Sequence, residues 1–319
     1  MRIAVMYSTH AASAPHLRRM AAMAGVDEVV VADSDDSAAA AVRGAQIVLG
    51  HRYLRQSLPF ADALQWVQST AAGVDRLPLQ ELADMGIALS RMTIASHTIA
   101  RHAVTLAWSL ARCLPQFMRE QRDGRWNNDV NWPHWPRRAM VMGLGGIGSE
   151  IARILHQDGI EVVGVRSRGE GPVVAGCDRI LHGDAFRAEL PHVDWLILAL
   201  PLTSTTRNLI DRIVLGALPA HAIVVNVGRG ETLTTGDLCE VLRGGHLGGA
   251  GLDVIAPKPT GNDDPIWHTP RLLITPHVAS HCQERSEMTE RFCEEQMARF
   301  VRGEPVRDLV DLACQSRLL

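Results

Sequence analysis

A glycine-rich segment in the middle of the chain constrains its fold more than any other feature. Gly143-Leu144-Gly145-Gly146-Ile147-Gly148 follows the apolar run Met140-Val141-Met142 and precedes residues 151–155, whose pattern is typical of a helix. Glycines at this spacing allow a tight turn, close approach of the backbone to a diphosphate and close packing of the helix on the strand. The start of the helix also offers unpaired N–H groups to an anion. Such a spacing can arise by chance, but the flanking patterns favour a nucleotide-binding strand-turn-helix unit.

The motif begins only at residue 143, and a chain of 319 residues is more natural for two domains than for one. Short, almost continuously apolar runs alternate with helix-compatible stretches around the motif, as in a parallel sheet covered on both faces. These runs are residues 139–142, 162–165, 195–200, 223–227, 251–254 and 272–274. A similar alternation precedes them, with strands expected near residues 3–6, 28–31, 47–49 and 66–68. The pattern predicts two doubly wound α/β domains.

Two long helix-compatible stretches, residues 98–122 and 284–301, are expected to connect the domains and to leave a cleft between them. The segment Trp126–Arg138 is rich in tryptophan and proline. It is interpreted either as an arm at a dimer interface or as a packed linker.

Composition narrows the class of partner. The net charge of −3 gives no sign of a nucleic-acid or anionic-membrane partner, so a small-molecule ligand is expected. No apolar run approaches the roughly 18 residues that span a bilayer, and the N-terminal residues read as a strand rather than as a signal peptide. The cysteines are scattered without CxxC pairs, which disfavours a disulfide framework or a zinc site. A cytoplasmic protein without a metal is therefore expected.

The end of the second strand of the nucleotide unit indicates which cofactor is bound. An NAD-binding unit carries an acidic residue there, about 20 residues after the motif, for the adenosine ribose hydroxyls. Here the sequence reads Arg166-Ser167-Arg168. Guanidinium groups and a hydroxyl suit a 2′-phosphate, so NADP(H) is predicted to be preferred over NAD(H). The alternative is a solvated loop with two surface arginines.

Seven blocks along the chain resemble the D-2-hydroxyacid dehydrogenase family, particularly its glyoxylate/hydroxypyruvate reductase branch. They are residues 66–75, the glycine motif, and residues 200–206, 225–230, 251–254, 275–277 and 303–306. The resemblance implies a central NAD(P)-binding Rossmann domain, residues 101–280, inserted into a split substrate domain, residues 1–100 and 281–319. It also implies a homodimer.

Reduction of a 2-keto acid requires a cation to hold the carboxylate and polarise the carbonyl, and an acid to protonate the nascent alkoxide. Arg229 and His277 follow apolar strands, whose carboxyl ends face the ligand crevice in such sheets, and both fit these tasks. The resemblance implies that the backbone amides of Ala72 and Gly73 bind the substrate carboxylate. It further implies that the cofactor is lined by Leu200, Pro201, Thr206, Val227, Gly228 and Asp253.

One position departs from the family pattern. A glutamate that normally pairs with the catalytic histidine is replaced by Lys258, the only lysine of the chain. A cation facing His277 would lower the pKa of the imidazole and weaken the proton donor. Three alternatives follow. Lys258 points to solvent, with Asp263, Asp264 or Glu284 as the acid; or it faces the cleft as a second cation or as the proton donor; or it marks an impaired site. Arg101 is a second exchange of a family glutamate for a cation.

The sequence therefore predicts an oxidoreductase that transfers hydride between NADP(H) and a small 2-keto or 2-hydroxy acid similar to glyoxylate or hydroxypyruvate. NAD(H) remains a possible cofactor. The alternative is a catalytically altered member that acts as a nicotinamide-nucleotide-dependent binding protein.

Overall fold

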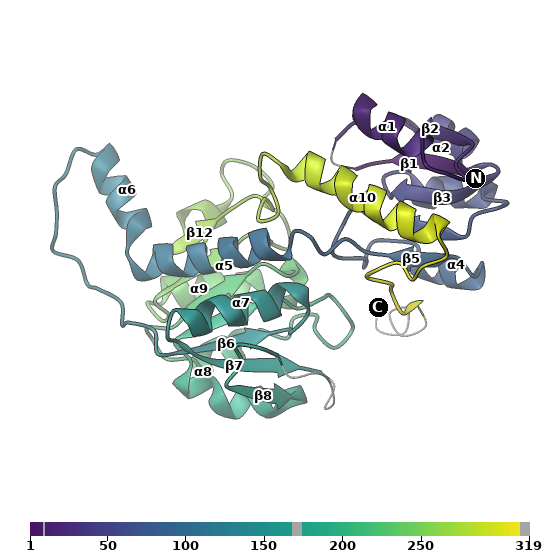
Figure 1. Ribbon diagram of the computed structural model, residues 1–319. Coiled ribbons are helices and arrows are strands. Elements are labelled where there is room, and N and C mark those ends of the chain that lie inside the picture. Colours follow the sequence, from purple (N-terminus) through teal and green to yellow (C-terminus); the bar gives the residue numbers. More distant parts are fainter. Residues whose placement is uncertain (9, 168–173, 313–319) are drawn as a thin grey trace. The chain divides into compact units, whose positions relative to one another are not determined.

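The computed structural model describes residues 1–8, 10–167 and 174–312 (Figure 1). The chain forms two compact units. The first, called here the terminal unit, contains Met1–Ala95 and Cys282–Leu319, and the second, called the central unit, contains Ser96–His281. Arg168 lies outside the described residues.

The terminal unit is built on a parallel sheet of strand order β2-β1-β3-β4-β5. Its strands are β1 (Arg2–Met6), β2 (Glu28–Val31), β3 (Ala45–Gly50), β4 (Trp66–Gln68) and β5 (Ala88–Ser90). Its helices are α1 (Ala14–Ala21), α2 (Asp35–Val42), α3 (Leu54–Ser57), η1 (Leu58–Phe60), α4 (Leu79–Asp84) and α10 (Arg285–Val301).

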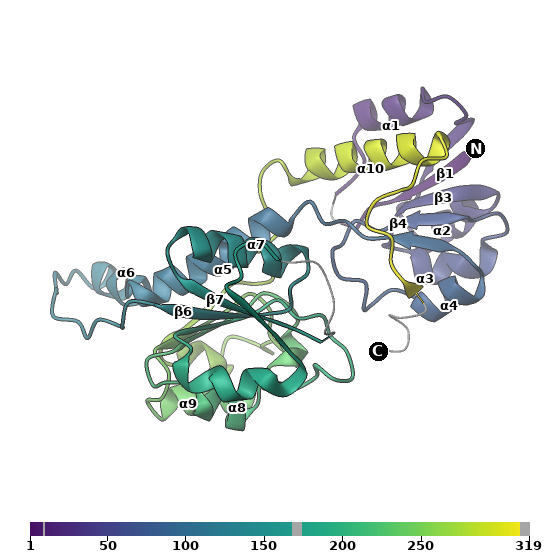
Figure 2. The same ribbon diagram turned by 60° about the horizontal axis from the view of Figure 1, so that its bottom comes forward.

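Alternating side chains of β1 separate the two cores of this unit. Ile3 and Val5 pack with residues of α1 and α10, whereas Ala4 and Met6 pack with residues of α2 and α4. This period of two is the geometry of a strand buried on both faces. Figure 2 shows α1 and α10 side by side over one face of the sheet.

The central unit carries a parallel sheet of order β12-β11-β10-β9-β6-β7-β8. Its strands are β6 (Arg138–Met142), β7 (Glu161–Arg166), β8 (Arg179–His182), β9 (Trp195–Leu198), β10 (Ile223–Asn226), β11 (Gly249–Leu252) and β12 (Leu272–Ile274). This is the strand order of a Rossmann fold, in which the order of the parallel strands reverses between β6 and β9. The predicted fold class of two doubly wound α/β domains is confirmed.

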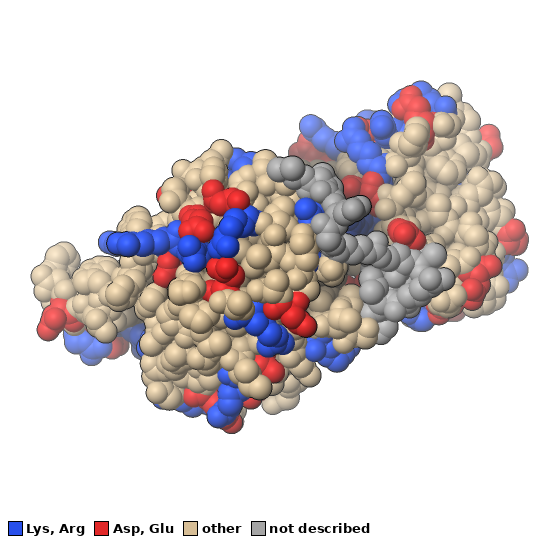
Figure 3. Space-filling view, turned by 90° about the horizontal axis from the view of Figure 1, so that it is seen from below, with Lys and Arg blue, Asp and Glu red and all other residues tan. Residues whose placement is uncertain are grey.

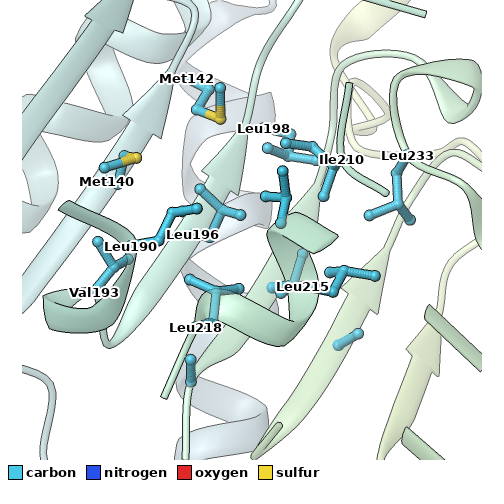
Figure 4. Close-up of a cluster of buried hydrophobic side chains, with 14 of the residues drawn as sticks. Met140, Met142, Leu190, Val193, Leu196, Leu198, Ile210, Leu215, Leu218 and Leu233 are labelled. Atoms are coloured by element: carbon cyan, nitrogen blue, oxygen red, sulfur yellow. The ribbon is translucent and has the colours of Figure 1, made fainter. Parts of the chain in front are cut away.

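Helices cover both faces of the central sheet. They are α5 (Ser96–Ala111), α6 (Leu114–Arg122), α7 (Gly146–Gln157), η2 (Gly183–His192), α8 (Arg212–Ala217), η3 (Gly230–Thr232), α9 (Thr235–Arg243) and η4 (Pro265–His268). α5 and α7 pack together on one face. The other face forms a buried cluster with η2, α8 and α9, in which Met140, Leu196 and Leu215 take part (Figure 4).

The prediction of one helix over residues 98–122 is wrong at its centre. α5 ends at Ala111, and Cys113 adopts a left-handed conformation with φ of 56° before α6 begins. Pro115 in the first turn of α6 lacks the N–H that a continuous helix needs. The chain therefore changes direction here although it contains no glycine.

On the face seen in Figure 3, Lys and Arg side chains alternate with Asp and Glu rather than forming one basic patch. Within residues 1–8, 10–167 and 174–312, the helices are too short or too polar to cross a membrane.

Candidate active site

The glycine motif forms the turn between β6 and α7. Gly143 has φ of +94°, and a Cβ there would lie 2.7 Å from the carbonyl oxygen of Ala199. A Cβ at Gly148 would lie 1.8 Å from the carbonyl oxygen of Gly143. These two glycines are thus required by close backbone packing inside the turn.

Gly145 is different, since it is exposed at the N-cap of α7 and a Cβ there would meet no atom within 4 Å. The following Gly146 and Ile147 form the first turn of α7, where the leading N–H groups have no partner within the helix. An open backbone at a helix N-terminus fits the diphosphate of a dinucleotide. The residues present therefore fit such a cofactor.

The end of β7 carries no carboxylate before the undescribed segment starts. Arg166 is the last residue of β7 and is partly buried, and Ser167 follows it on the surface. Arg166 pairs in register with His182 of β8. The described part of this strand end is thus cationic and polar.

The segments after β9 and β10 pack against each other. A Cβ at Gly228 would lie 2.6 Å from the carbonyl oxygen of Leu200. The loop after Leu200 is closed by Thr206, whose hydroxyl donates to the carbonyl oxygen of Pro201 at 2.7 Å. Val227 is buried beside them. The residues expected to line a cofactor therefore gather at the carboxyl ends of neighbouring strands.

Arg229 lies at the end of a tightly held turn after β10. Its carbonyl oxygen accepts hydrogen bonds from the side chains of Asn226 (2.9 Å) and Thr232 (2.7 Å). Its Nη1 donates to the carbonyl oxygen of Gly228 at 2.9 Å. A Cβ at the next residue, Gly230, would lie 2.4 Å from the backbone of Ile255, so the turn packs directly on the segment that follows β11.

His277 follows β12 in a strained turn, because its φ of 58° is in the left-handed region that side chains other than glycine rarely adopt. Its backbone N–H donates to the carbonyl oxygen of Asp253 and to that of Thr275, each at 2.9 Å. The ring is exposed at the protein surface of the central unit. The turn thus presents the imidazole at the carboxyl edge of the sheet.

Asp253 anchors this turn through its buried carboxylate. The carboxylate accepts hydrogen bonds from the hydroxyl of Thr275 (2.7 Å), the N–H of Val278 (2.9 Å) and the N–H of Ala279 (3.1 Å). Its exposed fraction is 2%. Several donors around a desolvated carboxylate compensate for its burial and hold the turn in one conformation.

Two residues of this network were not identified from the sequence. Thr275 lies between Asp253 and His102 of α5, whose Nε2 is 2.9 Å from the Thr275 hydroxyl oxygen and 3.6 Å from the Asp253 carboxylate. Thr275 belongs to the recognised block of residues 275–277, but no role in the site was predicted for it. His102 lies far away in the sequence, and only the fold brings it here.

The two departures from the family pattern are found on the surface. Lys258 is exposed, and within the described residues its ammonium group takes part in no hydrogen bond or ion pair. Of the three suggested acids, Asp263 and Glu284 are exposed, and Asp264 accepts hydrogen bonds from the backbone of Thr260 and Ile266.

Arg101 is also exposed, and its Nε donates to Nε2 of His97 at 2.8 Å. His97 in turn contacts Glu150 of α7 at 2.7 Å. Hydrogen bonds from Arg153 and then from His97 lower the pKa of Glu150 to about 2. The charge of Arg101 thus belongs to a surface network between α5 and α7.

Ala72 and Gly73 belong to the terminal unit. They are partly buried in the turn after β4, where the N–H of Ala71 donates to the Ser69 hydroxyl at 3.1 Å. The side-chain amide of Gln68, the last residue of β4, donates to the carbonyl oxygens of Ser69 (2.9 Å) and Arg91 (3.2 Å). The turn is therefore fixed by side chains at its base.

Comparison with known proteins identifies the family that this chain resembles. The model for the NAD-binding domain of D-isomer specific 2-hydroxyacid dehydrogenases matches residues 104–279. The glyoxylate/hydroxypyruvate reductase A of Klebsiella pneumoniae strain 342 is 31% identical over 259 residues, which cover 78% of this chain and 81% of that protein. The human glyoxylate reductase/hydroxypyruvate reductase is 26% identical over 297 residues, which cover 88% and 87%.

Solved structures agree over nearly the whole chain. A D-isomer specific 2-hydroxyacid dehydrogenase from Xanthobacter autotrophicus, crystallised with NADPH and MES, has a TM-score of 0.81 and 27% identity, and 98% of each chain is covered. A family member from Klebsiella pneumoniae has a TM-score of 0.77 and 30% identity, with 98% of this chain and 97% of that chain covered. The chain therefore belongs to the D-isomer specific 2-hydroxyacid dehydrogenases, a family of NAD(P)-dependent oxidoreductases.

Proposed function

We propose that this protein reduces a small 2-keto acid of the glyoxylate or hydroxypyruvate type with NADPH. One observation carries the proposal. Arg229, Asp253 and His277 follow β10, β11 and β12, which are neighbours in the sheet that also carries the glycine turn. A guanidinium group and an imidazole therefore follow two strands that are separated only by β11, at the carboxyl edge of a dinucleotide-binding fold.

The chemistry needs few protein groups. The bound nicotinamide supplies the hydride. Arg229 holds the substrate carboxylate and polarises the keto oxygen, and a ring N–H of His277 gives its proton to that oxygen as charge develops. The backbone amides of Ala72 and Gly73 bind the carboxylate, which makes the terminal unit the substrate domain.

The cofactor is held along the carboxyl edge of the central sheet. The first turn of α7, at Gly145, Gly146 and Ile147, would hold its diphosphate. Thr206, Val227 and Asp253 would line the nicotinamide side, together with Leu200, Pro201 and Gly228. The carboxylate of Asp253 acts there mainly by holding the His277 turn.

The preference for NADPH is supported by the end of β7. Arg166 and Ser167 can bind a 2′-phosphate through charge-assisted hydrogen bonds, and neither residue repels it. The related Xanthobacter structure was solved with NADPH. The substrate class is supported by the names of the human and Klebsiella relatives.

We further propose a homodimer that uses an arm formed by α6 and residues 123–137. In Figure 1 this arm extends from the body of the central unit. Trp126 is 100% exposed and Met118 is 70% exposed. Large apolar side chains on a projecting segment favour a protein interface.

Lys258 favours a second candidate function, a nucleotide-dependent binding protein that lacks turnover. The two functions are separated by measuring NADPH oxidation with glyoxylate, hydroxypyruvate and pyruvate, alongside NADPH binding by calorimetry. Turnover of any of these acids supports the reductase. Binding without turnover supports the second candidate, and failure to bind either nicotinamide cofactor contradicts both.

A further inference from the structure

The N–H of Ala72 is the first of the two amides assigned to the substrate carboxylate. Within the described residues, neither this group nor the N–H of Gly73 donates to a protein acceptor, so both are available to a ligand. The N–H of Ala72 shares a planar trans peptide unit with the carbonyl group of Ala71, and the two groups point in opposite directions. That carbonyl oxygen accepts the N–H of Met92 at 2.9 Å. The bond from Met92 therefore sets the direction of the N–H of Ala72.

One peptide unit further back, the side chain of Gln68 holds the same structure. The N–H of Met92 belongs to the peptide unit that contains the carbonyl group of Arg91. This carbonyl oxygen accepts a hydrogen bond from Nε2 of Gln68 at 3.2 Å, and the same nitrogen donates to the carbonyl oxygen of Ser69 at 2.9 Å. The hydroxyl oxygen of Ser69 in turn accepts the N–H of Ala71 at 3.1 Å. Gln68 thus fastens both the start of the turn and the segment that supports it.

Gln296 of α10 fixes the orientation of the Gln68 amide. Both side chains belong to fully buried residues, each with an exposed fraction of 0%. Nε2 of Gln296 donates to Oε1 of Gln68 at 3.1 Å and to the carbonyl oxygen of Arg307 at 2.9 Å, and its Oε1 accepts the N–H of Arg307 at 3.1 Å. One backbone donor and one backbone acceptor permit a single orientation of the Gln296 amide. The two carbonyl oxygens beside Nε2 of Gln68 require the matching orientation there, so every polar atom of both amides has a partner.

We propose that Gln68 and Gln296 are positioning residues for the substrate carboxylate. Gln296 donates to Gln68, and Gln68 donates to the peptide unit of residues 91 and 92. That unit donates to the peptide unit of residues 71 and 72, which carries the N–H that binds the carboxylate. A side chain 228 positions away from Gln68 in the sequence therefore helps to aim the donors of the turn. The inference rests on the carboxylate site and the reductase function proposed above.

Loss of either amide should act on carboxylate binding first. It leaves buried polar atoms without a partner, and the peptide units of the turn can then rotate toward other partners. A carboxylate that needs two N–H donors in one geometry loses affinity when one of them turns away. The cofactor is assigned to the central unit, so its affinity should be spared.

Oxalate tests the carboxylate site without turnover, because it resembles a 2-keto acid but has no keto group to reduce. Calorimetry gives its dissociation constant from the NADPH complex of the wild type, Gln68→Met, Gln296→Met and the double variant. Methionine is similar in length to glutamine but has no N–H. We expect each single variant to weaken oxalate binding and to raise KM for glyoxylate about fivefold to tenfold, with a smaller change in kcat and an unchanged dissociation constant for NADPH. The double variant should bind oxalate about as well as Gln68→Met, because one pathway is interrupted only once.

Gln46→Met is the matched control. The Gln46 amide also bonds two backbone groups of the terminal unit, at Arg2 (2.8 Å) and Gly44 (2.9 Å), but it lies near the amino end of β3 rather than at the turn. This variant should bind oxalate and NADPH as the wild type does.

Wild-type affinity for oxalate in Gln296→Met overturns the proposal. Additive losses in the double variant also overturn it, because the two residues would then act separately. Equal weakening of oxalate and NADPH binding does the same, since the amides would then only support the fold. If the wild type binds oxalate but reduces no keto acid, the reductase function is contradicted while the positioning role is still tested by oxalate. If the wild type does not bind oxalate, the carboxylate site fails and this inference falls with it.

Discussion

Thr275 donates its hydroxyl hydrogen to the buried carboxylate of Asp253 at 2.7 Å, and this bond ties the strained turn of His277 to the end of the neighbouring strand. The same carboxylate accepts two backbone N–H groups of that turn. Asp253 can therefore influence proton transfer without touching the substrate.

Thr275→Val removes this hydroxyl while nearly preserving the side-chain shape. We expect kcat to fall on the order of tenfold to a hundredfold, because a hydrogen bond to a buried charge contributes about 1.5–3 kcal/mol. The dissociation constant for NADPH should hardly change. Steady-state kinetics with calorimetry measures both quantities. Thr289→Val removes the hydroxyl of a fully buried threonine elsewhere in the chain and is the control. Weaker NADPH binding with normal kcat would show instead that the network serves the cofactor.

Gly145 and Gly148 separate the binding role of the glycine turn from its packing role. Gly145→Ala places a methyl group in open space, so the midpoint temperature of thermal unfolding should not change. The same methyl group should obstruct binding of the diphosphate. Gly148→Ala places its methyl group 1.8 Å from a backbone oxygen and should also lower the free energy of unfolding by roughly 1–3 kcal/mol. We expect NADPH affinity to fall at least about tenfold in both variants. Full affinity in Gly145→Ala would place the diphosphate elsewhere.

Arg166→Ala should reduce the preference for NADPH over NADH. Loss of a charge-assisted hydrogen bond to a 2′-phosphate predicts a decrease of about tenfold or more in the ratio of the two kcat/KM values. Arg187→Ala, at an exposed arginine elsewhere in the same unit, should leave this ratio unchanged. If Arg166→Ala leaves the ratio unchanged, as the control does, Arg166 does not bind the 2′-phosphate.

Lys258→Glu tests whether the exposed ammonium group acts on the proton donor. Reduction requires the protonated imidazole, so the rate falls as pH rises through the pKa of the donor. Replacing a cation by a carboxylate favours the imidazolium and should move this descending limb to higher pH. Because Lys258 is exposed, solvent and salt screen the effect, and we expect a shift below about one pH unit that decreases in high salt.

Lys258→Gln, which only removes the charge, should give an intermediate shift. Identical pH profiles for the wild type and both variants at low ionic strength would assign Lys258 to the solvated surface alone.

Trp126→Glu should weaken self-association, because it places a charge on the fully exposed aromatic residue of the arm. Light scattering after size-exclusion chromatography measures the fraction of dimer as a function of concentration. Ile213→Glu changes another exposed apolar residue, which lies on α8 outside the arm, and should leave that fraction unchanged. A dimer that persists in Trp126→Glu at low micromolar concentration would remove Trp126 from the interface.

Local sequence predicted much of this architecture because its signals are physically local. The apolar runs of buried parallel strands and the glycines of a tight turn each depend on neighbours a few residues away. Two edge strands were not predicted: β5 spans only three residues, and β8 has no buried residue, so neither formed a clear apolar run. Pro115 did mark the break of the long helix, because a proline inside a helical pattern commonly ends the helix just before it, and the prediction of one continuous helix overlooked this signal.

The sequence alone determined the doubly wound fold class, the strand ends that carry Arg229 and His277, and the family resemblance. Only the tertiary structure decided how those side chains are held. Asp253, Thr275 and His102 meet because three separate elements converge, and Gln296 reaches Gln68 because α10 packs on the sheet that contains β4. Hydrogen bonds between residues distant in sequence depend on the packing of whole elements, and that packing is a property of the complete fold.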